Sequence, residues 1–231
     1  MTVPDSTTSA PAPVASTRHT LILLAVLAAI AVAGASQTSS GTGSLTSGER
    51  MTLYCSVVLA QIGLVALVRR GTRRAGVSLR DVIGGESNAL AIARDVLFGL
   101  ATWAAWEAFS RLALAPVRER SASLDPLLPT TTLEIATWVA VSVFAGIGEE
   151  LVFRGYLQRQ LGALLRSRGA GIALQAMIFG AVHAYQGAWR AATAVAIGLL
   201  YGVVTRASGS ARAAMVAHAC TDVFGGVVLR G

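Results

Sequence analysis

The sequence predicts an all-α membrane protein, a polytopic transmembrane helical bundle of about seven spans. Hydrophobic residues make up 54% of the 231-residue chain and charged residues only 13%, against about 25% charged residues in an ordinary soluble domain. The mean hydropathy is +0.61. Apolar runs that approach the ~20 residues needed to cross ~30 Å of hydrocarbon recur along the chain, with short polar stretches between them. Each element is therefore expected to be a membrane helix.

The chain divides into three predicted regions, 1–17, 18–131 and 132–231. Ser, Thr, Pro and Ala dominate the first region without apolar periodicity, which predicts a disordered amino-terminal tail. Arg18 and His19 then precede an apolar run from Leu21 to Ala35. That run is either the first membrane helix or a signal sequence that is cleaved.

Six further apolar runs complete the predicted bundle. Several are shorter than ~20 residues, so tilt or interfacial flanks must complete these spans. In the run from Ala89, four charged residues (Arg94, Asp95, Glu107 and Arg111) predict a polar stripe that packs inward or lies at the two interfaces, and not a second active site. The runs are Met51 to Val68, Ala89 to Ala115, Leu133 to beyond Glu149, Gly169 to Ala184, Ala191 to Val204 and Ala211 to Leu229.

All 19 basic residues are Arg, and their placement orients the predicted bundle. The loop after the second run is the most basic, which predicts that it is cytoplasmic. Alternation then places the amino terminus in the cytoplasm and the carboxyl terminus outside the cell membrane. The net charge of +7 thus reflects topology; no nucleic-acid partner is expected, because such a protein shows a basic face on a soluble fold. The five Arg of this loop are Arg69, Arg70, Arg73, Arg74 and Arg80.

Two adjacent carboxylates, Glu149 and Glu150, end the apolar run from Trp138 to Ile147. An ionised side chain near the bilayer centre costs roughly 2.5–3.5 kcal/mol, so an intramembrane acid is expected to face a cavity, find a partner and serve a function. The polar groups on this and neighbouring spans that can meet the two carboxylates are Arg154, His183, His218 and Asp222.

Counting from the predicted turns compares the depths of these groups in the membrane. Glu149 lies 17 residues before the predicted hairpin turn at 166–168, and His183 lies 15 residues after it. Both are therefore roughly 22–26 Å from the turn. His218 lies roughly 12–15 Å from its own turn. This looser match would be closed by a bend at Gly155 or by a helix that extends beyond the lipid.

Spacing within each helix predicts different roles for the carboxylates. Glu149 and Glu150 point about 100° apart, so Glu149 can face a cavity while Glu150 faces Arg154 one turn later. The Glu150–Arg154 pair is expected to be a structural clamp. His218 and Asp222 are also four residues apart. The carboxylate can then set the imidazole tautomer and leave the other ring nitrogen free for substrate or water.

Three segments in the second half of the chain carry a recognisable pattern. They are Glu149-Glu150-Leu151-Val152-Phe153-Arg154-Gly155, Phe179-Gly180-Ala181-Val182-His183 and His218-Ala219-Cys220-Thr221-Asp222. In this order and helical placement they resemble the CPBP family of intramembrane proteases, which includes the type II CAAX prenyl endopeptidases and the bacteriocin-processing and immunity (Abi) proteins of bacteria. The resemblance covers roughly Thr132 to Val228. Asp222 departs from the family pattern, which commonly has Asn at this position.

The resemblance implies peptide hydrolysis by an activated water, with the region 132–231 as the catalytic core. Glu149 would act as the general base, and His183 would help to hold the same water. His218 would face the developing oxyanion or the leaving group, with Asp222 orienting it. The substrate would be a membrane-associated or lipid-modified protein or peptide in the lipid bilayer, and the resemblance leaves open whether it is prenylated.

Metal dependence and two other function classes also stay open. The water mechanism requires no cofactor, but Glu149, His183 and His218 are also a chemically sound ligand set for a single divalent metal such as zinc. A small bundle with buried acids and histidines is further compatible with a non-catalytic immunity or binding protein, or with a small proton-coupled transporter.

Overall fold

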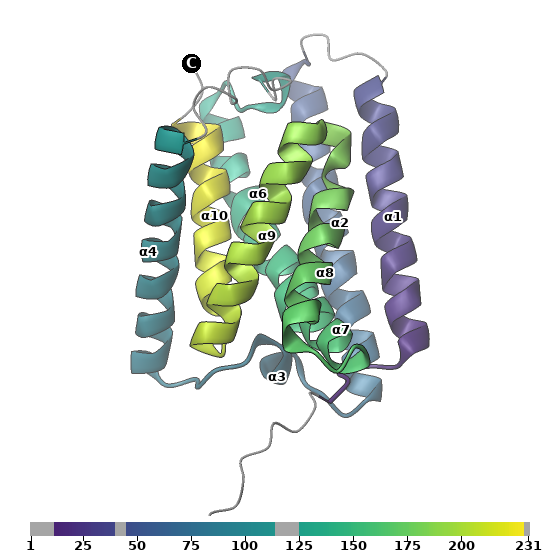
Figure 1. Cartoon of the computed structure of the whole chain (residues 1–231). Coiled ribbons are helices and arrows are strands. Elements are labelled where there is room, and N and C mark those ends of the chain that lie inside the picture. Colours follow the sequence, from purple (N-terminus) through teal and green to yellow (C-terminus); the bar gives the residue numbers. More distant parts are fainter. Residues whose placement is uncertain (1–11, 40–44, 114–124, 229–231) are drawn as a thin grey trace, which may run out of the picture.

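The computed structural model describes residues 12–39, 45–113 and 125–228 and confirms the predicted all-α class. Helices run side by side along the length of one bundle, and each of the seven predicted apolar runs has a corresponding helix among the described residues (Figure 1). In chain order the elements are α1 (Thr17–Ser39), α2 (Ser47–Arg74), α3 (Leu79–Ile83), α4 (Ala89–Ala113), the 3₁₀ turn η1 (Asp125–Leu127), α6 (Thr132–Glu150), the π-helical segment η2 (Leu151–Leu157), α7 (Gln158–Leu164), α8 (Arg168–Val182), the 3₁₀ turn η3 (Ala184–Gln186), α9 (Ala188–Ser208) and α10 (Arg212–Val227).

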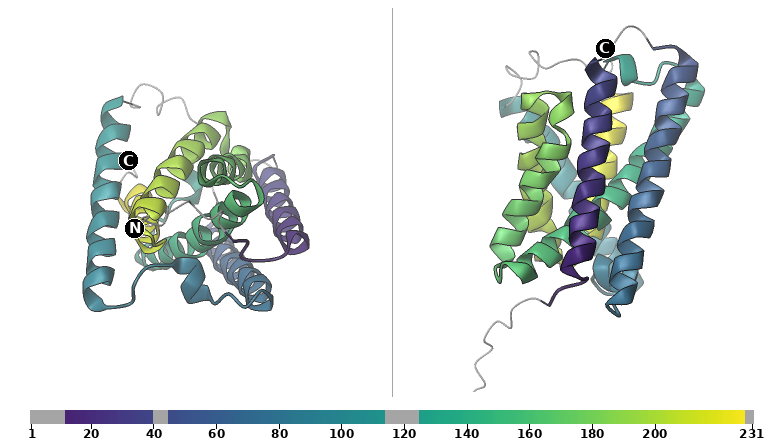
Figure 2. Two further views of the ribbon diagram at one scale, coloured as in Figure 1. Left: turned by 60° about the horizontal axis from the view of Figure 1, so that its bottom comes forward. Right: turned by 90° about the vertical axis from the view of Figure 1, so that its right-hand side faces the viewer.

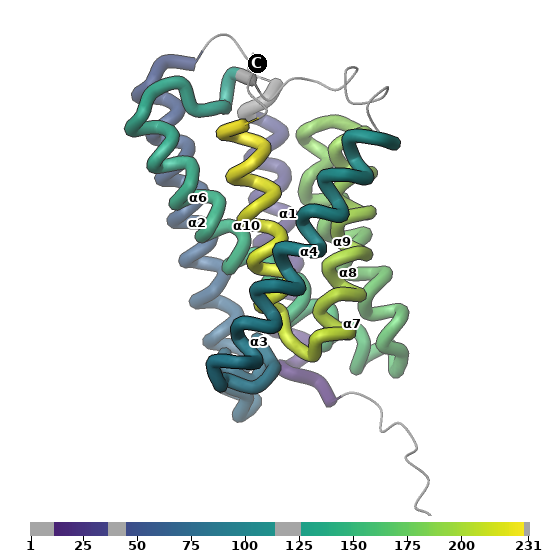
Figure 3. Tube along the Cα trace, turned by 90° about the vertical axis from the view of Figure 1, so that its left-hand side faces the viewer, coloured from purple at the N-terminus to yellow at the C-terminus, as the bar shows by residue number. Residues whose placement is uncertain are grey.

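The helices α1 and α4 lie at opposite flanks of the bundle, with the helices of the second half of the chain between them (Figures 1 and 2). Helix α10 packs against both α6 and α4, and Figure 3, viewed from the α4 side, shows it running between them. The start of α1 and the end of α10 lie at opposite ends of the bundle. An odd number of passes, as predicted, gives this arrangement.

Five helical stretches among the described residues are long and apolar enough to cross a membrane, which confirms a multi-pass membrane protein. The shorter apolar helix α8 has 15 residues, and α10 has 16. Both lie alongside the longer helices (Figure 1), so the predicted count of about seven spans is an approximation. The five stretches are Thr17–Ser36, Ser47–Arg74, Ala89–Ala113, Thr132–Leu164 and Ala188–Ser208.

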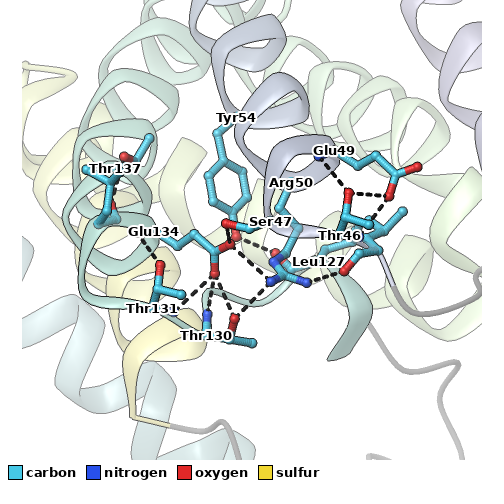
Figure 4. A network of polar contacts seen from close by, with 12 residues as sticks. Thr46, Ser47, Glu49, Arg50, Tyr54, Leu127, Thr130, Thr131, Glu134 and Thr137 are labelled. Carbon is cyan, nitrogen blue, oxygen red and sulfur yellow. Dashed lines mark hydrogen bonds and ion pairs between the residues drawn. The ribbon is translucent and has the colours of Figure 1, made fainter.

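The start of α6 is fixed by a capping box and by a buried ion pair with α2 (Figure 4). The hydroxyl of Thr131 accepts a hydrogen bond from the backbone N–H of Glu134 at 3.3 Å, and the Glu134 carboxylate accepts the N–H of Thr131 at 3.1 Å. Arg50 of α2 donates to the same carboxylate at 3.0 Å. This cluster sets the register between α2 and α6 at one end of the bundle.

The hairpin turn predicted at 166–168 joins α7 to α8. Arg166 adopts a positive φ of 51°, a left-handed conformation that few non-glycine residues take. The hydroxyl of Ser167 then caps α8 by accepting the N–H of Ala170 at 3.2 Å. The helices α6, η2 and α7 form one continuous 33-residue stretch, and Glu149 lies near its middle.

The end of the predicted disordered tail is ordered, which corrects the expectation for 1–17. Val14 and Ala15 are buried. The side-chain amide of Gln160 in α7 accepts their N–H groups at 2.8 and 3.1 Å and donates to the carbonyl of Ala15 at 2.9 Å. The sequence does not reveal this contact because the amide that satisfies the tail backbone lies about 145 residues away in the chain. Residues 1–11 lie outside the described residues.

Helix α1 packs as a component of the bundle. Leu23 and Leu27 belong to its main hydrophobic core, and the hydroxyl of Thr20 shares a buried 3.0 Å hydrogen bond with the phenol of Tyr156 in η2. Cleavage after this segment would expose the core surface that α1 covers. Whether the segment is cleaved is not tested by the structure, so both alternatives stay predictions.

The charged residues of α4 are paired, as the predicted inward or interfacial stripe requires. Asp95 is fully buried and contacts Arg212 of α10 at 2.8 Å. Arg94 lies 3.4 Å from the other oxygen of Asp95, and Arg111 lies 3.8 Å from Glu107 one turn before it. The Asp95–Arg212 pair joins α4 to α10, and the other two pairs lie within α4.

Candidate active site

Glu149 and Glu150 end α6, and a π-helical segment follows them directly. All seven residues of η2 are buried, and the N–H of Gln158 donates to the carbonyl of Phe153, five residues earlier. π-helical turns are rare and occur frequently at functional sites. The segment begins directly after Glu150 and carries Arg154.

Glycines let three helices approach one another at this depth. A Cβ on Gly146 would lie 2.8 Å from the backbone nitrogen of Ala219 in α10, and a Cβ on Gly148 would lie 2.5 Å from the side-chain oxygen of Gln61 in α2. Small residues at helix contacts allow such close packing in membranes. The end of α6 is therefore held between α2 and α10.

The carboxylate of Glu149 uses only one of its two oxygens for a hydrogen bond in the described structure. Its Oε1 accepts from Nε2 of Gln61 at 3.0 Å. Its Oε2 is buried without a hydrogen-bond partner among the described residues, and it lies 4.0 Å from Nε2 of His183 and 4.0 Å from Nε2 of His218. Three residues from separate segments thus converge on one point.

His183 lies at the carboxyl end of α8 with its ring orientation fixed. Its Nδ1 is 2.7 Å from the carbonyl oxygen of Phe179. Because a carbonyl only accepts, Nδ1 carries a proton, and Nε2 faces Glu149. The predicted depth match between Glu149 and His183 agrees with this placement.

His218 is held by Glu150 and lies as close to Glu149 as His183 does. Its Nδ1 donates to Oε1 of Glu150 at 2.7 Å, while Asp222 Oδ2 lies 3.5 Å from Nε2, the other ring nitrogen. Glu150 therefore occupies the position on His218 that the spacing assigned to Asp222. Sequence spacing could not predict this contact between helices, because Glu150 and His218 are 68 residues apart in the chain. The gap that straight helices left between the depths of His218 and Glu149 is closed in the structure, as the sequence analysis allowed.

Arg154 and Glu150 form the predicted one-turn pair. Nη1 of Arg154 lies 2.8 Å from Oε1 of Glu150, and both side chains are completely buried. The guanidinium carbon lies 4.5 Å from the ring centroid of Phe179 and 5.4 Å from that of Tyr201, so aromatic faces supply part of its surroundings. Glu150 Oε1 thus joins Arg154 to His218.

Gln61 was not among the sequence-predicted site residues. It interrupts the apolar run from Met51 to Val68, and an amide in a membrane helix needs a partner because burying it unpaired is costly. An amide inside an apolar run could therefore have marked Gln61 as a candidate site residue. It could not have identified Glu149 as the partner, since the two are 88 residues apart.

The residues fit a metal in chemical type but not in spacing. Both histidines direct their second ring nitrogen at an oxygen acceptor, as metal-binding histidines do. Tetrahedral ligands about 2.0–2.1 Å from zinc lie about 3.3 Å apart, whereas Oε2 of Glu149 is 4.0 Å from each imidazole nitrogen. Over the described ranges, no three His, Cys, Asp or Glu side chains are arranged to hold a metal ion. A bound metal would require the three side chains to move closer together.

A comparison with protein families found one match, and it covers the part of the chain that contains this site. The family model for Rce1-like type II CAAX prenyl endopeptidases matches residues 131–224, from the cap of α6 to near the end of α10. No curated protein and no solved structure matches the chain. The matched stretch includes every residue that the sequence pattern nominated, and a protease family of this kind supports intramembrane protease function in general. Over residues 131–224 the chain is thus similar to the Rce1-like type II CAAX prenyl endopeptidases, in agreement with the family that its sequence pattern resembles.

Proposed function

We propose that the protein is an intramembrane endopeptidase that hydrolyses a peptide bond of a membrane-associated or lipid-modified protein or peptide. The observation that carries the proposal is the convergence of Glu149 Oε2 with the Nε2 atoms of His183 and His218, each 4.0 Å away. These separations are longer than a hydrogen bond, and one water can bridge each of them. Glu149 then activates that water.

In the proposed reaction the water oxygen attacks the carbonyl carbon of the scissile peptide. Glu149 accepts one water proton through Oε2, and the lone pair on Nε2 of His183 accepts a hydrogen bond from the other. The carbon–nitrogen bond then breaks, and Glu149 returns its proton to the leaving amine. Each bond broken thus has a group positioned to supply or remove the proton.

His218 is proposed to stabilise the oxyanion that forms on the substrate carbonyl. When protonated, it presents an Nε2–H toward the site while its Nδ1–H stays on Glu150. Glu150 and Asp222 then balance the positive charge of the ring, and Arg154 balances Glu150. A fixed donor of this kind is worth most in a dry site, where water does not screen it.

The first experiment identifies the substrate. Peptide termini of the membrane proteome are compared between cells with the wild-type protein, Glu149→Gln and the exposed control Glu86→Gln. Termini that appear with wild type and Glu86→Gln but not with Glu149→Gln identify the cut sites. Identical termini in all three strains would refute the endopeptidase and would favour a binding protein. Purified protein is then given a farnesylated peptide and the same peptide without the lipid, which tests the lipid-modified class.

Metal removal separates two forms of the chemistry. We propose the metal-free form, because Glu150 and Arg154 balance charge beside Glu149 and do not complete a ligand shell. Stringently metal-free protein is then expected to keep its activity. If chelation instead removes activity, zinc restores it and purified protein holds about one metal per chain, Glu149, His183 and His218 are ligands. Loss of that metal in His183→Ala would confirm the ligand role.

The proposed location is the cell membrane, with the amino terminus in the cytoplasm. The start of α1 and the Arg-rich end of α2 lie at the same end of the bundle (Figure 1), and positive loops favour the cytoplasmic side. A single cysteine from Arg73→Cys, introduced with Cys55→Ser and Cys220→Ser, is expected to react with an impermeant thiol reagent only after the cells are opened. Labelling of intact cells would reverse the orientation.

A further inference from the structure

Gln61 is a buried amide in the middle of a membrane helix, where only 6% of the residue surface is exposed. An amide without partners costs several kcal/mol in hydrocarbon surroundings. Its Nε2 donates to Oε1 of Glu149 at 3.0 Å, whereas its own Oε1 has no hydrogen-bond partner among the described residues. The one contact that accounts for an amide at this position is therefore the contact with Glu149.

The direction of this contact follows from the chemistry of the two groups. An amide can present either its NH₂ or its carbonyl, but an ionised carboxylate only accepts hydrogen bonds. Gln61 must therefore turn its NH₂ toward Glu149 when Glu149 is the ionised base. Hydrogen bonds to charged groups are shorter and stronger than those between neutral groups, so the pair prefers this arrangement.

The packing around Gln61 limits the alternatives open to its side chain. Gly148 precedes Glu149, and a Cβ there would lie 2.5 Å from Oε1 and 3.2 Å from Cβ of Gln61. The backbone of α6 thus lies directly against the amide. The absence of a side chain at 148 leaves the space that the amide occupies beside the carboxylate.

We propose that Gln61 is a positioning residue for Glu149. By occupying Oε1 it fixes the rotation of the carboxylate and leaves Oε2 directed between the two imidazole nitrogens, 4.0 Å from each. Without this donor the carboxylate can rotate and bring either oxygen toward the site. The inference rests on the proposed function of Glu149 as the base, and it assigns to α2 a part in a site otherwise built from α6, α8 and α10.

The proposal predicts a loss of rate without loss of substrate binding. Replacing Gln61 by Leu, or by Met as a second variant in case Leu does not fold, removes the donor and keeps an apolar chain of similar size. We expect kcat on the cleaved peptide to fall roughly tenfold to a hundredfold, because small displacements of a reacting group cost about that much, while KM stays unchanged. In the Glu149→Gln background the same replacement should have no further effect on kcat.

A matched control separates positioning from packing. Leu64 lies on the same helix three residues later and is also buried in the core. Leu64→Ala removes packing from α2 without touching the carboxylate, so it should lower the thermal stability and leave kcat per folded molecule unchanged. Equal loss of kcat in Leu64→Ala and Gln61→Leu would show that Gln61 acts only through packing.

A spectroscopic measurement tests the contact even if the substrate is not yet known. The infrared difference between wild-type protein and Glu149→Gln isolates the carboxylate band of Glu149. Gln61→Leu and Gln61→Met are expected to shift this band, and Leu64→Ala is not. An unshifted band in both Gln61 variants overturns the proposal whatever the activity. If the band shifts but Glu149→Gln stays fully active, the contact stands, and it is the role of Glu149 as base that fails.

Discussion

Glu134 and Glu149 lie on the same membrane helix, about four turns apart; the side chain of Glu134 is fully buried, and that of Glu149 is 18% exposed. They differ in how many of their oxygen lone pairs are occupied. Both oxygens of Glu134 accept hydrogen bonds, whereas Oε2 of Glu149 has no hydrogen-bond partner among the described residues. The two ends of α6 therefore hold their carboxylates in different ways, one with both oxygens occupied and one with an oxygen open toward two histidines.

The Glu134 carboxylate is saturated with hydrogen bonds from α2 and from its own helix cap (Figure 4). Oε1 accepts from Ser47 at 2.5 Å and from Arg50 at 3.0 Å. Oε2 accepts from the N–H and the hydroxyl of Thr130 at 2.6 and 2.9 Å and from the N–H of Thr131 at 3.1 Å. No acceptor capacity remains for a substrate or for a reacting water, so this end of α6 is structural.

At the other end, Glu149 and Glu150 each have a buried oxygen without a partner among the described residues. Glu150 uses its Oε1 for both Arg154 and His218, and Glu149 uses its Oε1 for Gln61. An unsatisfied buried polar atom is costly, and it persists where something other than stability selects it. The free oxygen of Glu149 is therefore the most informative single atom of the site.

The largest expected effect is on the rate of Glu149→Gln. The amide keeps the shape of the carboxylate but cannot accept a proton, so the rate should fall by roughly 10²- to 10⁴-fold, the usual contribution of a general base. The thermal midpoint should change little, since Oε2 makes no hydrogen bond within the described residues. The rate is measured on the cleaved peptide, and the thermal midpoint is measured in a melt of the purified variant. A folded variant that keeps more than about a tenth of the rate would contradict the role.

The opposite result is expected at the saturated end. Glu134→Ala leaves Arg50 without its buried carboxylate, and breaking such a pair costs roughly 3–5 kcal/mol of the free energy of unfolding. The rate per folded molecule should stay close to that of wild type, because the cluster lies roughly 22 Å from Glu149 along α6. Unfolding monitored by tryptophan fluorescence measures the loss. If Glu134→Ala were as stable as wild type but inactive, the comparison between the two ends would fail.

Arg154→Ala tests whether the buried Arg154–Glu150 pair stabilises the fold as the Arg50–Glu134 pair does at the other end of α6. Removing the guanidinium leaves Glu150 with His218 as its partner, so the loss of unfolding free energy should be about 3 kcal/mol, at the low end for a broken buried pair. Activity should fall as well, because Glu150 then holds His218 less firmly. Thermal melts and rate measurements on Arg154→Ala and wild-type protein measure the two losses. A variant as stable as wild type but inactive would move Arg154 from support into the catalytic group.

Sequence spacing predicted the local part of the site and missed the part that depends on helix neighbours. The spacing of Glu150 and Arg154 and the depth of Glu149 and His183 follow from the rise and twist of a helix, and the structure has both. Which helices face one another does not follow from periodicity, so the contacts of Gln61 with Glu149 and of Glu150 with His218 could not be found. The bundle class was predictable because apolar length alone determines it.

The π-helical segment contains Gly155, where the sequence analysis allowed for a bend. Depth estimates assume straight α-helices, and by that count His218 lay too near its own turn. Seven residues after Glu150 adopt the wider π geometry, a known cause of kinks in helices. Such a segment has no sequence signature comparable to a cap or a glycine turn. The ordered residues Val14 and Ala15 were missed for a related reason, since the amide that binds their backbone is in α7.

The smallest expected effect concerns Asp222, whose role the spacing and the geometry describe differently. Its side chain is 36% exposed, and its Oδ2 lies 3.5 Å from Nε2 of His218, whereas Glu150 is fully buried and holds Nδ1 at 2.7 Å. Exposed pairs contribute about 0.2–1 kcal/mol, so Asp222→Asn should change the rate by less than about fivefold.

Glu150→Gln is the matched change on the other side of the ring. It weakens a buried hydrogen bond to a charged group, so the rate should fall by about tenfold or more. Rates of both variants on the same peptide, with thermal melts to correct for folding, compare the two carboxylates directly. If Asp222→Asn lost more of the rate than Glu150→Gln, Asp222 and not Glu150 would be the residue that orients His218. The expected order instead gives the larger effect to the acid that has an oxygen without a partner among the described residues, as proposed for Glu149 against Glu134.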